Sequence, residues 1–274
     1  MDIKAFKMDG LGNDFVIIDQ RTRNISLTKD QIKKICDRNF IGCDQLILIK
    51  KNRKIDAGLE FYNSDGSASG ACGNGTRCVA SLLSKENNKK EITLWTSGGT
   101  LKSKILEDNL VETEIGVSKT NWKEIPLNKE LDTKNLNIKI LDNNNKEHIG
   151  GTAINVGNPH IIFFVDELQN FDVSIIGPQL EIHKIFPEKC NVTIAQIINK
   201  NLIKVKVWER GAGLTKACGT AACATAFAGT LNKFTEDNTD IEFETGKLSI
   251  FIDDKNSIHM KGPVSDIKKI SIEL

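Results

Sequence analysis

Short apolar runs recur along the chain, and their spacing predicts strands more often than helices. The clearest runs are rich in Ile, Val, Leu and Phe, and they fall at residues 15–19, 45–49, 59–62, 161–165 and 202–208. Short or alternating apolar runs bounded by polar residues are typical of strands. Helical spacing occurs at residues 28–38, which begin with a suitable N-cap threonine, and after Cys72 and Cys218. The pattern predicts an α+β fold with much antiparallel sheet.

The two halves of the chain share an internal repeat. The matched pairs are Gly12-Asn13 with Gly157-Asn158, Gln45 with Asn191, Asn63 with Glu209, Ala71-Cys72-Gly73 with Ala217-Cys218-Gly219, and Gly116 with Gly262. The first pair is separated by 145 residues and each of the others by 146. A nearly constant separation predicts two copies of one structural unit. A polar stretch at 119–150, with the loop-forming segment 142–146, places the domain boundary near its start.

Cys72 and Cys218 lie in equivalent segments of the repeat. In both, a strand ends in a polar residue, a loop of small residues follows, and Cys-Gly precedes residues that suit a helix. Each cysteine is therefore expected at a helix N-terminus, where free N–H groups and the helix dipole stabilise a thiolate or a substrate carboxylate. A thiolate on one side of a carbon and a thiol on the other suit proton exchange with inversion.

Polar residues at strand ends and in turns are the further candidates. The repeated amides are Asn13, Gln45, Asn63, Asn158 and Asn191. His160 and Glu209 could tune the ionisation of the cysteines, and Arg210 suits a second, distal carboxylate. The remaining cysteines are interpreted as small buried apolar residues: Cys36, Cys43, Cys78, Cys190 and Cys223.

Charge and cysteine content exclude several classes of partner. Lys and Arg total 37 against 36 for Asp and Glu, so the net charge of +1 predicts neither nucleic acid nor a membrane surface as partner. Seven cysteines, an odd number, with no export signal predict reduced thiols in the cytoplasm. The absence of Cys-x-x-Cys and the presence of only four widely spaced histidines argue against a metal site.

Together these motifs resemble the diaminopimelate epimerase family. The matching segments are Gly10-Leu-Gly-Asn-Asp-Phe15, Phe61-Tyr-Asn-Ser-Asp-Gly-Ser67, Cys72-Gly-Asn-Gly75, Asn155-Val-Gly-Asn-Pro-His160, Glu209-Arg-Gly-Ala-Gly213 and Ala217-Cys-Gly-Thr220. Three departures from the family pattern are Leu214, Trp208 and the segment Ser69-Gly70-Ala71. None of them touches a residue to which the chemistry is assigned.

The resemblance implies an enzyme that interconverts LL- and meso-diaminopimelate without a cofactor, for the synthesis of lysine and peptidoglycan precursors. It implies a cytoplasmic homodimer of two pseudo-symmetric domains, 1–118 plus 263–274 and 119–262. Each would be a sheet wrapped around a central helix, with the active site in the cleft between them. Cys72 and Cys218 would be the paired bases, tuned by His160 and Glu209. The substrate-binding residues would be Asn13, Gln45, Asn63, Gly73, Asn74, Asn158, Asn191, Glu209, Arg210, Gly219 and Thr220.

Two other function classes remain as alternatives. A proline or hydroxyproline racemase would typically carry Cys-Gly-His after the first base, whereas this chain has Cys72-Gly-Asn, and it would need no Arg210. A binding module without activity predicts that one base is missing, yet both cysteines are present. A pyridoxal enzyme is disfavoured because no lysine stands in a recognisable site. A phosphate loop at 10–12 lacks the third glycine and the helix.

Overall fold

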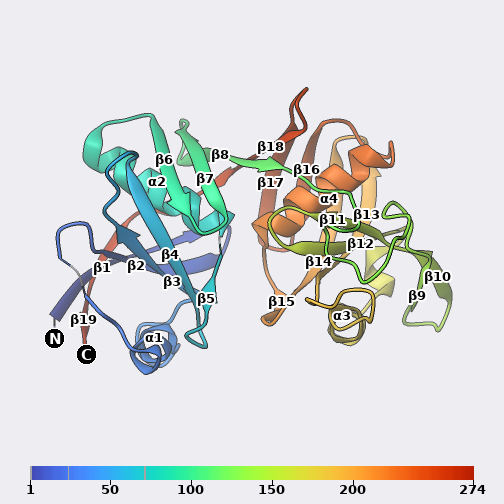
Figure 1. Cartoon of the computed structure of the whole chain (residues 1–274), viewed down its shortest axis with the longest axis horizontal. Helices are drawn as coiled ribbons and strands as arrows, with labels where there is room; N and C mark the ends of the chain where they lie inside the picture. Colours follow the sequence, from blue (N-terminus) through green and yellow to red (C-terminus); the bar gives the residue numbers. More distant parts are fainter. Residues whose placement is uncertain (1, 24, 71) are drawn as a thin grey trace. The chain divides into compact units, whose positions relative to one another are not determined.

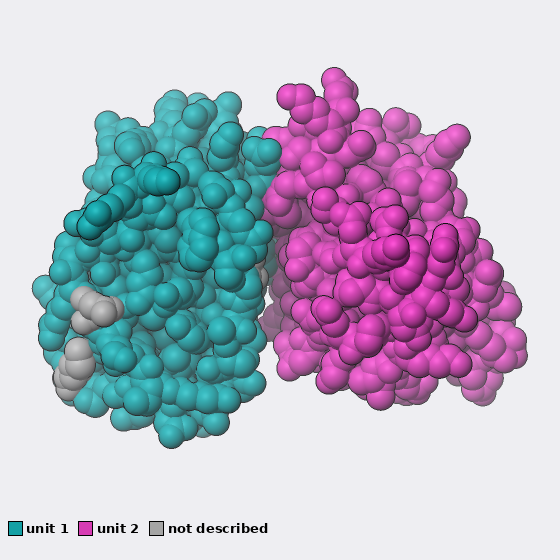
Figure 2. Space-filling model, viewed as in Figure 1, with its two compact units in different colours: residues 1–114, 261–274 teal, residues 115–260 magenta. Residues whose placement is uncertain are grey.

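The computed structural model describes residues 2–23, 25–70 and 72–274. The chain divides into two compact units, Met1–Glu114 with Lys261–Leu274 (unit 1) and Ile115–Met260 (unit 2) (Figure 2). It passes between the units within strand β8 (Leu110–Val117) and again within β18 (Ser257–Pro263). Ala71, one of the repeated residues, lies outside the described residues.

Unit 1 is a continuous sheet with one helix on each face. In hydrogen-bonded order the strands are β19 (Lys268–Glu273), β1 (Asp2–Gly10), β2 (Asn13–Asp19), β3 (Gln45–Lys50), β4 (Ala57–Asn63), β6 (Glu91–Thr96), β7 (Gly99–Ile105) and β8, which also pairs with β18. Neighbours are antiparallel except β2 with β3 and β4 with β6, and the short β5 (Ala68–Ser69) pairs with β4. Helix α2 (Gly73–Asn87) packs on β1, β2, β6 and β7, while α1 (Lys29–Cys36) packs on β3.

Alternate residues of the central strands face the two helices. On β2, Phe15 and Ile17 join the apolar cluster that contains the buried side of α2. The alternate residues Val16 and Ile18 join the cluster on the other face, which contains Ile32 of α1. Both faces of the sheet are therefore buried, which explains why these strands are almost continuously apolar in sequence. Figure 1 shows α2 enclosed by the curving sheet.

Unit 2 follows the same plan. Its main strands, in order, are β11 (Thr152–Asn155), β12 (Pro159–Val165), β13 (Asn191–Asn199), β14 (Leu202–Glu209), β16 (Asn238–Phe243) and β17 (Gly246–Ile252). Neighbours are antiparallel except β12 with β13 and β14 with β16. The short β15 (Gly213–Thr215) pairs with β14. Helix α4 (Gly219–Leu231) contacts β11, β12, β13, β16 and β17, while α3 (Val173–Glu181) packs on the other face against β13 and β14. Unit 2 also contains a hairpin of β9 (Ile138–Leu141) and β10 (Glu147–Gly150) and a single 3₁₀ turn, η1 (Leu168–Asn170).

The backbone pairing repeats along with the sequence. Phe61 pairs with Ser69 where β4 meets β5, and Val207 pairs with Thr215 where β14 meets β15, each partner 146 residues further on. The parallel pairs also sit at matching places in the two strand orders. The predicted α+β class, with two similar and mostly antiparallel units each built around a helix, is confirmed.

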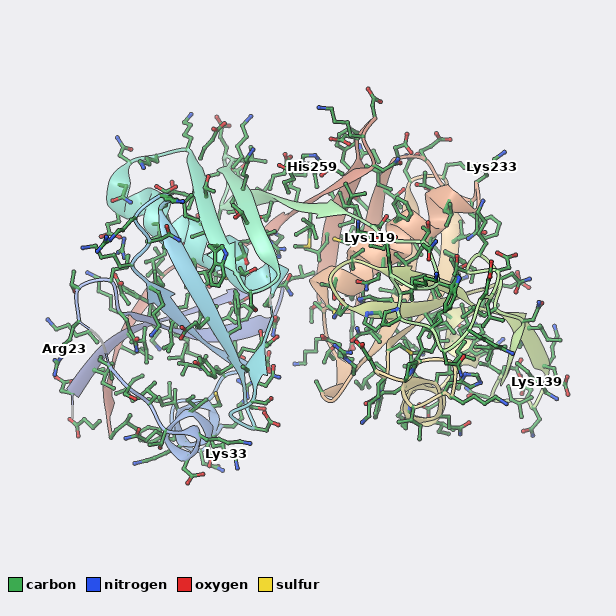
Figure 3. The ribbon with its side chains drawn as sticks, viewed as in Figure 1. Arg23, Lys33, Lys119, Lys139, Lys233 and His259 are labelled. Atoms are coloured by element: carbon green, nitrogen blue, oxygen red, sulfur yellow. The ribbon has the colours of Figure 1, made fainter. Side chains whose placement is uncertain are left out.

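The helix predicted at 28–38 is α1, with Thr28 as its N-cap. The Thr28 hydroxyl accepts a hydrogen bond from the Gln31 N–H at 3.2 Å, and the Gln31 side chain accepts one from the Thr28 N–H at 2.9 Å. This reciprocal capping satisfies two donors that a helix start leaves free. Figure 3 shows exposed cations such as Lys33 and Lys139 pointing outward from the ribbon. Among the described residues, no helix has both the length and the apolar character that crossing a membrane requires.

Candidate active site

Cys72 is the N-cap of α2. Its backbone is extended, and its sulfur accepts a hydrogen bond from the Gly75 N–H at 3.4 Å. Gly75 is needed here because a Cβ atom would lie 2.7 Å from Ile47 Cδ1 and 3.0 Å from the Phe61 ring. The small residues after the cysteine therefore let the helix begin directly against β3 and β4. The predicted placement of this cysteine at a helix N-terminus is what the structure shows.

Four predicted amides form two pairs in unit 1. Asn13 Oδ1 lies 3.8 Å from the Cys72 sulfur and accepts a hydrogen bond from the Asn74 side chain at 3.3 Å. Gln45, which opens β3, donates to Asn63 Oδ1 at 2.8 Å, because the register of β3 and β4 places these two residues opposite each other. Asn13 thus lies beside the sulfur and is held by Asn74, and Gln45 and Asn63 orient one another.

Cys218 occupies the equivalent position as the N-cap of α4. The residue is 5% exposed, and its sulfur lies 3.4 Å from the Thr220 hydroxyl. Burial, together with the negative charge of Glu209, raises the pKa of the Cys218 thiol well above its ordinary value. The Thr220 hydroxyl and the Ala221 N–H oppose that shift. Cys218 is therefore a neutral thiol at pH 7.

Glu209 is the predicted tuning residue that acts on Cys218. It ends β14, and its carboxylate accepts a hydrogen bond from the Thr215 hydroxyl at 2.6 Å. It raises the pKa of Cys218 both through its charge and as a hydrogen-bonding partner. The pairing of β14 with the short β15 brings Glu209 opposite Gly213 and holds this loop closed.

His160 is fully buried, and its Nε2 faces two side-chain amides. Its Nε2 lies 2.8 Å from Asn158 Oδ1, while the Asn191 amide nitrogen approaches the same atom at 3.5 Å. Burial, with the positive charge of Arg210, lowers the pKa of His160 to about 3. The ring is therefore neutral, and its Nε2–H donates to Asn158. In unit 2, the hydrogen bonds of His160 thus fix Asn158, while Glu209 is the residue that acts on the Cys218 thiol.

Asn191 joins the ends of two strands and fixes the backbone of Arg210. Its amide nitrogen donates to the Pro159 carbonyl at 3.1 Å, and its oxygen accepts from the Arg210 N–H at 3.0 Å. The exposed Arg210 guanidinium donates to the Glu188 carbonyl at 2.8 Å. The buried amide therefore sets where the arginine leaves the sheet.

Sequence reasoning missed Glu181, which holds the loop after β14. Its carboxylate accepts from the Trp208 indole N–H at 2.8 Å and from the Gly211 N–H at 3.2 Å, and Lys189 lies 3.5 Å away. The only available signal was Trp208 itself, a departure from the family pattern whose indole N–H needs a partner. In the described ranges, no group of three or more His, Cys, Asp or Glu side chains gathers closely enough to hold a metal ion.

Comparison with known proteins identifies the family. A sequence description of diaminopimelate epimerases matches residues 5–120 and 152–267, and each matched segment contains one of the two helix-capping cysteines. The chain belongs to the diaminopimelate epimerase family. The diaminopimelate epimerase of Pelagibacter ubique (strain HTCC1062) is 73% identical over the full length of both chains. That of Acidiphilium cryptum (strain JF-5) is 40% identical over 94% of this chain and 92% of the relative.

Solved structures of distant relatives share the fold of this diaminopimelate epimerase family member. A phenazine biosynthesis protein of the PhzF family from Bacillus anthracis aligns over both full chains with a TM-score of 0.68 at 15% identity. A hydroxyproline epimerase from Agrobacterium vitis aligns over 98% of this chain and 91% of its own, with a TM-score of 0.69 at 12% identity. At such low identity these likenesses concern architecture alone.

The buried His160 predicts a stability that depends on pH. In the unfolded chain a histidine has a pKa near 6.5. Below that pH the unfolded state therefore binds a proton at His160, whereas the folded state leaves the ring neutral. The stability present above pH 6.5 is therefore lost as the pH falls towards 3, at about 1.4 kcal/mol per pH unit. Urea unfolding at pH 6.5 and 5 is expected to show about 2 kcal/mol of this loss. His160→Gln should remove that part of the slope and leave the contribution of the other groups. Equal slopes in the two proteins would contradict the prediction.

Proposed function

We propose that this protein epimerises diaminopimelate between the LL and meso isomers, with Cys72 and Cys218 as paired bases. The observation that carries the proposal is that both repeat-related cysteines cap helices, in a chain 73% identical to a diaminopimelate epimerase over its whole length.

The proposed reaction is a proton exchange without net oxidation or reduction. One cysteine thiolate removes the α-proton and becomes a thiol, which leaves a carbanion whose charge spreads onto the α-carboxylate. The opposite thiol then gives its proton to the other face of the carbon and becomes a thiolate. The raised pKa of Cys218 supports its role as the proton donor in the first turnover.

The helix starts would stabilise the transition state. An amino-acid α-proton is a weak acid, so the developing carboxylate charge needs fixed donors. The N–H groups at the beginning of α2 and α4 are such donors, at Gly73-Asn74 and Gly219-Thr220. These donors and the two thiols would carry the chemistry without a cofactor.

The remaining predicted residues would bind the distal amino-acid end of the substrate. Arg210 would hold the distal carboxylate with its planar pair of donors. The amides would bind around it: Asn13, Gln45, Asn63, Asn158 and Asn191. His160 would support this set through Asn158, and Glu209 would also meet the distal end. The resemblance further leads us to propose a homodimer in the cytoplasm, serving lysine and peptidoglycan precursor synthesis. None of the seven cysteines, all of which the structure describes, forms a disulfide.

Turnover of LL-diaminopimelate in deuterated water, with a reductant and no added cofactor, tests the proposal. We expect meso-diaminopimelate that carries deuterium at one α-carbon. Exchange on proline or another amino acid, but not on diaminopimelate, would keep the cysteine chemistry and overturn the substrate. If folded, reduced protein exchanges the α-proton of no amino acid in a panel, the proposed enzymatic function is overturned altogether.

A further inference from the structure

We infer that Asp44 is a positioning residue that orients the Asn13 amide so that its oxygen faces the Cys72 sulfur. The inference rests on the proposed function in one respect, the role of Cys72 as a base. Asp44 lies just before β3 and belongs to none of the sequence motifs described above. Its importance follows from what its carboxylate accepts.

The orientation of Asn13 follows from the chemistry of its neighbours. Asp44 Oδ2 lies 2.9 Å from Asn13 Nδ2, and a carboxylate oxygen accepts hydrogen bonds only from donors. The NH₂ end of Asn13 must therefore point to Asp44, which leaves the oxygen to face Cys72 at 3.8 Å and the Asn74 amide nitrogen at 3.3 Å. A flipped amide would set a carbonyl against the carboxylate and NH₂ against NH₂.

Asp44 is itself held in place on several sides. Its Oδ2 also accepts from the Asp14 N–H at 3.1 Å, and its Oδ1 accepts from Arg38 at 2.6 Å. Its backbone N–H donates to the Asp14 carbonyl and to Asp14 Oδ1, both at 3.0 Å. Arg38 forms two further bonds to the Asp14 carboxylate, at 2.7 and 2.9 Å. This cluster ties the loop before β3 to the start of β2, so the carboxylate cannot follow a rotating amide.

Cys72 therefore lies within reach of both an acceptor and a donor. A thiol can donate its S–H to Asn13 Oδ1, and a thiolate can accept the Gly75 N–H. A cysteine that alternates between base and acid in each cycle needs both forms supported. If Asn13 were free to flip, its NH₂ group would join Gly75 as a second donor, favour the thiolate and weaken Cys72 as a base.

Unit 2 holds the equivalent amide the opposite way round. There Asn158, the counterpart of Asn13, gives its oxygen to His160 Nε2 at 2.8 Å. The position that matches Asp44 in the repeat is Cys190, which offers no carboxylate. Asn13 is therefore held through its NH₂ group by Asp44, whereas Asn158 is held through its oxygen by His160. Asp44 accounts for this difference between the units.

Other charged groups near Asn13 and Cys72 must be separated from this effect. Lys7 on β1 lies 3.6 Å from the Asp14 carboxylate, and Arg38 follows α1. The buried Arg77 of α2 lies close to Gly10, where an added Cβ would be 3.4 Å from its guanidinium. Asp14 is the best control, because it belongs to the same ion-pair cluster as Asp44 and its side chain does not bind the Asn13 amide.

Asp44→Asn and Asp14→Asn, each in the full chain, form the matched pair. Both remove one negative charge, but only the first gives the Asn13 amide a partner that accepts either orientation. The measurement is the rate of iodoacetamide alkylation at Cys72 against pH, read by mass spectrometry of its peptide. We expect the apparent alkylation pKa of Cys72 to fall by about one pH unit in Asp44→Asn, as a donor replaces an acceptor, and by much less in Asp14→Asn.

Equal shifts in the two variants, or no shift in Asp44→Asn, would overturn the inference. Steady-state kinetics supply a second readout, in which Asp44→Asn should lower kcat more than it raises KM for diaminopimelate. Alkylation does not require turnover. A wild-type protein that fails to epimerise diaminopimelate but shows the alkylation shift would therefore overturn the proposed function alone.

Discussion

Replacing either Cys72 or Cys218 with alanine is expected to abolish inversion at the α-carbon of diaminopimelate. A positioned acid or base contributes about 10²–10⁴-fold to a proton transfer, so turnover should fall at least that far. The fold should survive either change, because each cysteine is the N-cap residue that precedes a helix rather than a residue in its middle. Conversion of LL-diaminopimelate, followed by chiral chromatography, measures the loss.

Each variant should keep half of the chemistry. The cysteine that remains can still remove the α-proton from its own side and return a solvent deuteron to the same side. We therefore expect slow exchange without inversion, in one stereochemical configuration for Cys72→Ala and in the opposite one for Cys218→Ala. Loss of exchange at both configurations in both variants would show that the cysteines do not act as separate bases.

Cys36→Ala is the matched control for loss of a thiol. Cys36 is a buried cysteine at the end of α1, and it contacts the Cys43 sulfur at 3.5 Å. Its replacement should lower stability through a small cavity and leave turnover close to that of the wild type. Near-normal inversion by Cys72→Ala or Cys218→Ala, with circular dichroism that matches Cys36→Ala, would contradict the assignment of the two bases.

The strands and the helix-capping cysteines were predictable because local and global signals agree there. Residues 15–18 are all apolar because both faces of β2 are buried, one by α2 and the other by α1. The repeat in the sequence places Cys72 and Cys218 in equivalent loops. Each Cys-Gly segment alone is a weak signal, but the constant separation of 146 residues shared with other matched positions indicates that the two are equivalent.

Helix α3 was not predicted, for a physical reason. Its nine residues contain Pro178, which removes a backbone donor and normally argues against a helix interior. Packing overrides that penalty: Gly177 lies against Trp208, where an added Cβ would approach the indole ring to 2.4 Å. The same helix ends in Glu181, which binds the Trp208 indole and the Gly211 N–H. Missing the helix therefore meant missing the support of the loop that carries Glu209 and Arg210.

The orienting contacts were equally hidden from sequence. Asp44 reads as an ordinary loop acid, and only the pairing of β2 with β3 brings it to Asn13. His160 was predicted to tune the cysteines, and that role stays a prediction. Its Nε2–H donates to Asn158, and the Asn191 amide lies beside the same nitrogen; the two residues lie at the starts of adjacent strands that pair in parallel. Donor and acceptor geometry depends on register, and the amino-acid pattern does not record it.

Arg210→Lys is expected to reduce kcat/KM for diaminopimelate by about 10–100-fold, mostly through KM. A charged bidentate hydrogen bond contributes about 1.5–3 kcal/mol, and a lysine ammonium cannot reproduce the planar fork. The backbone at this position should not move, because Asn191 holds the Arg210 N–H at 3.0 Å and this bond does not involve the side chain. Arg23→Lys, the same change at an exposed arginine of unit 1, is the control and should have no effect (Figure 3).

Lysine distinguishes binding of the distal carboxylate from a general loss of activity. It has the same chain as diaminopimelate but lacks that carboxylate, so it cannot use the Arg210 fork. Exchange of the lysine α-proton in deuterated water should be very slow in the wild type and no slower in Arg210→Lys. The ratio of activity on diaminopimelate to activity on lysine should therefore be smaller in the variant than in the wild type. If the variant instead loses the same factor on both substrates, Arg210 acts on the shared reacting end, and the distal carboxylate must be held by other donors.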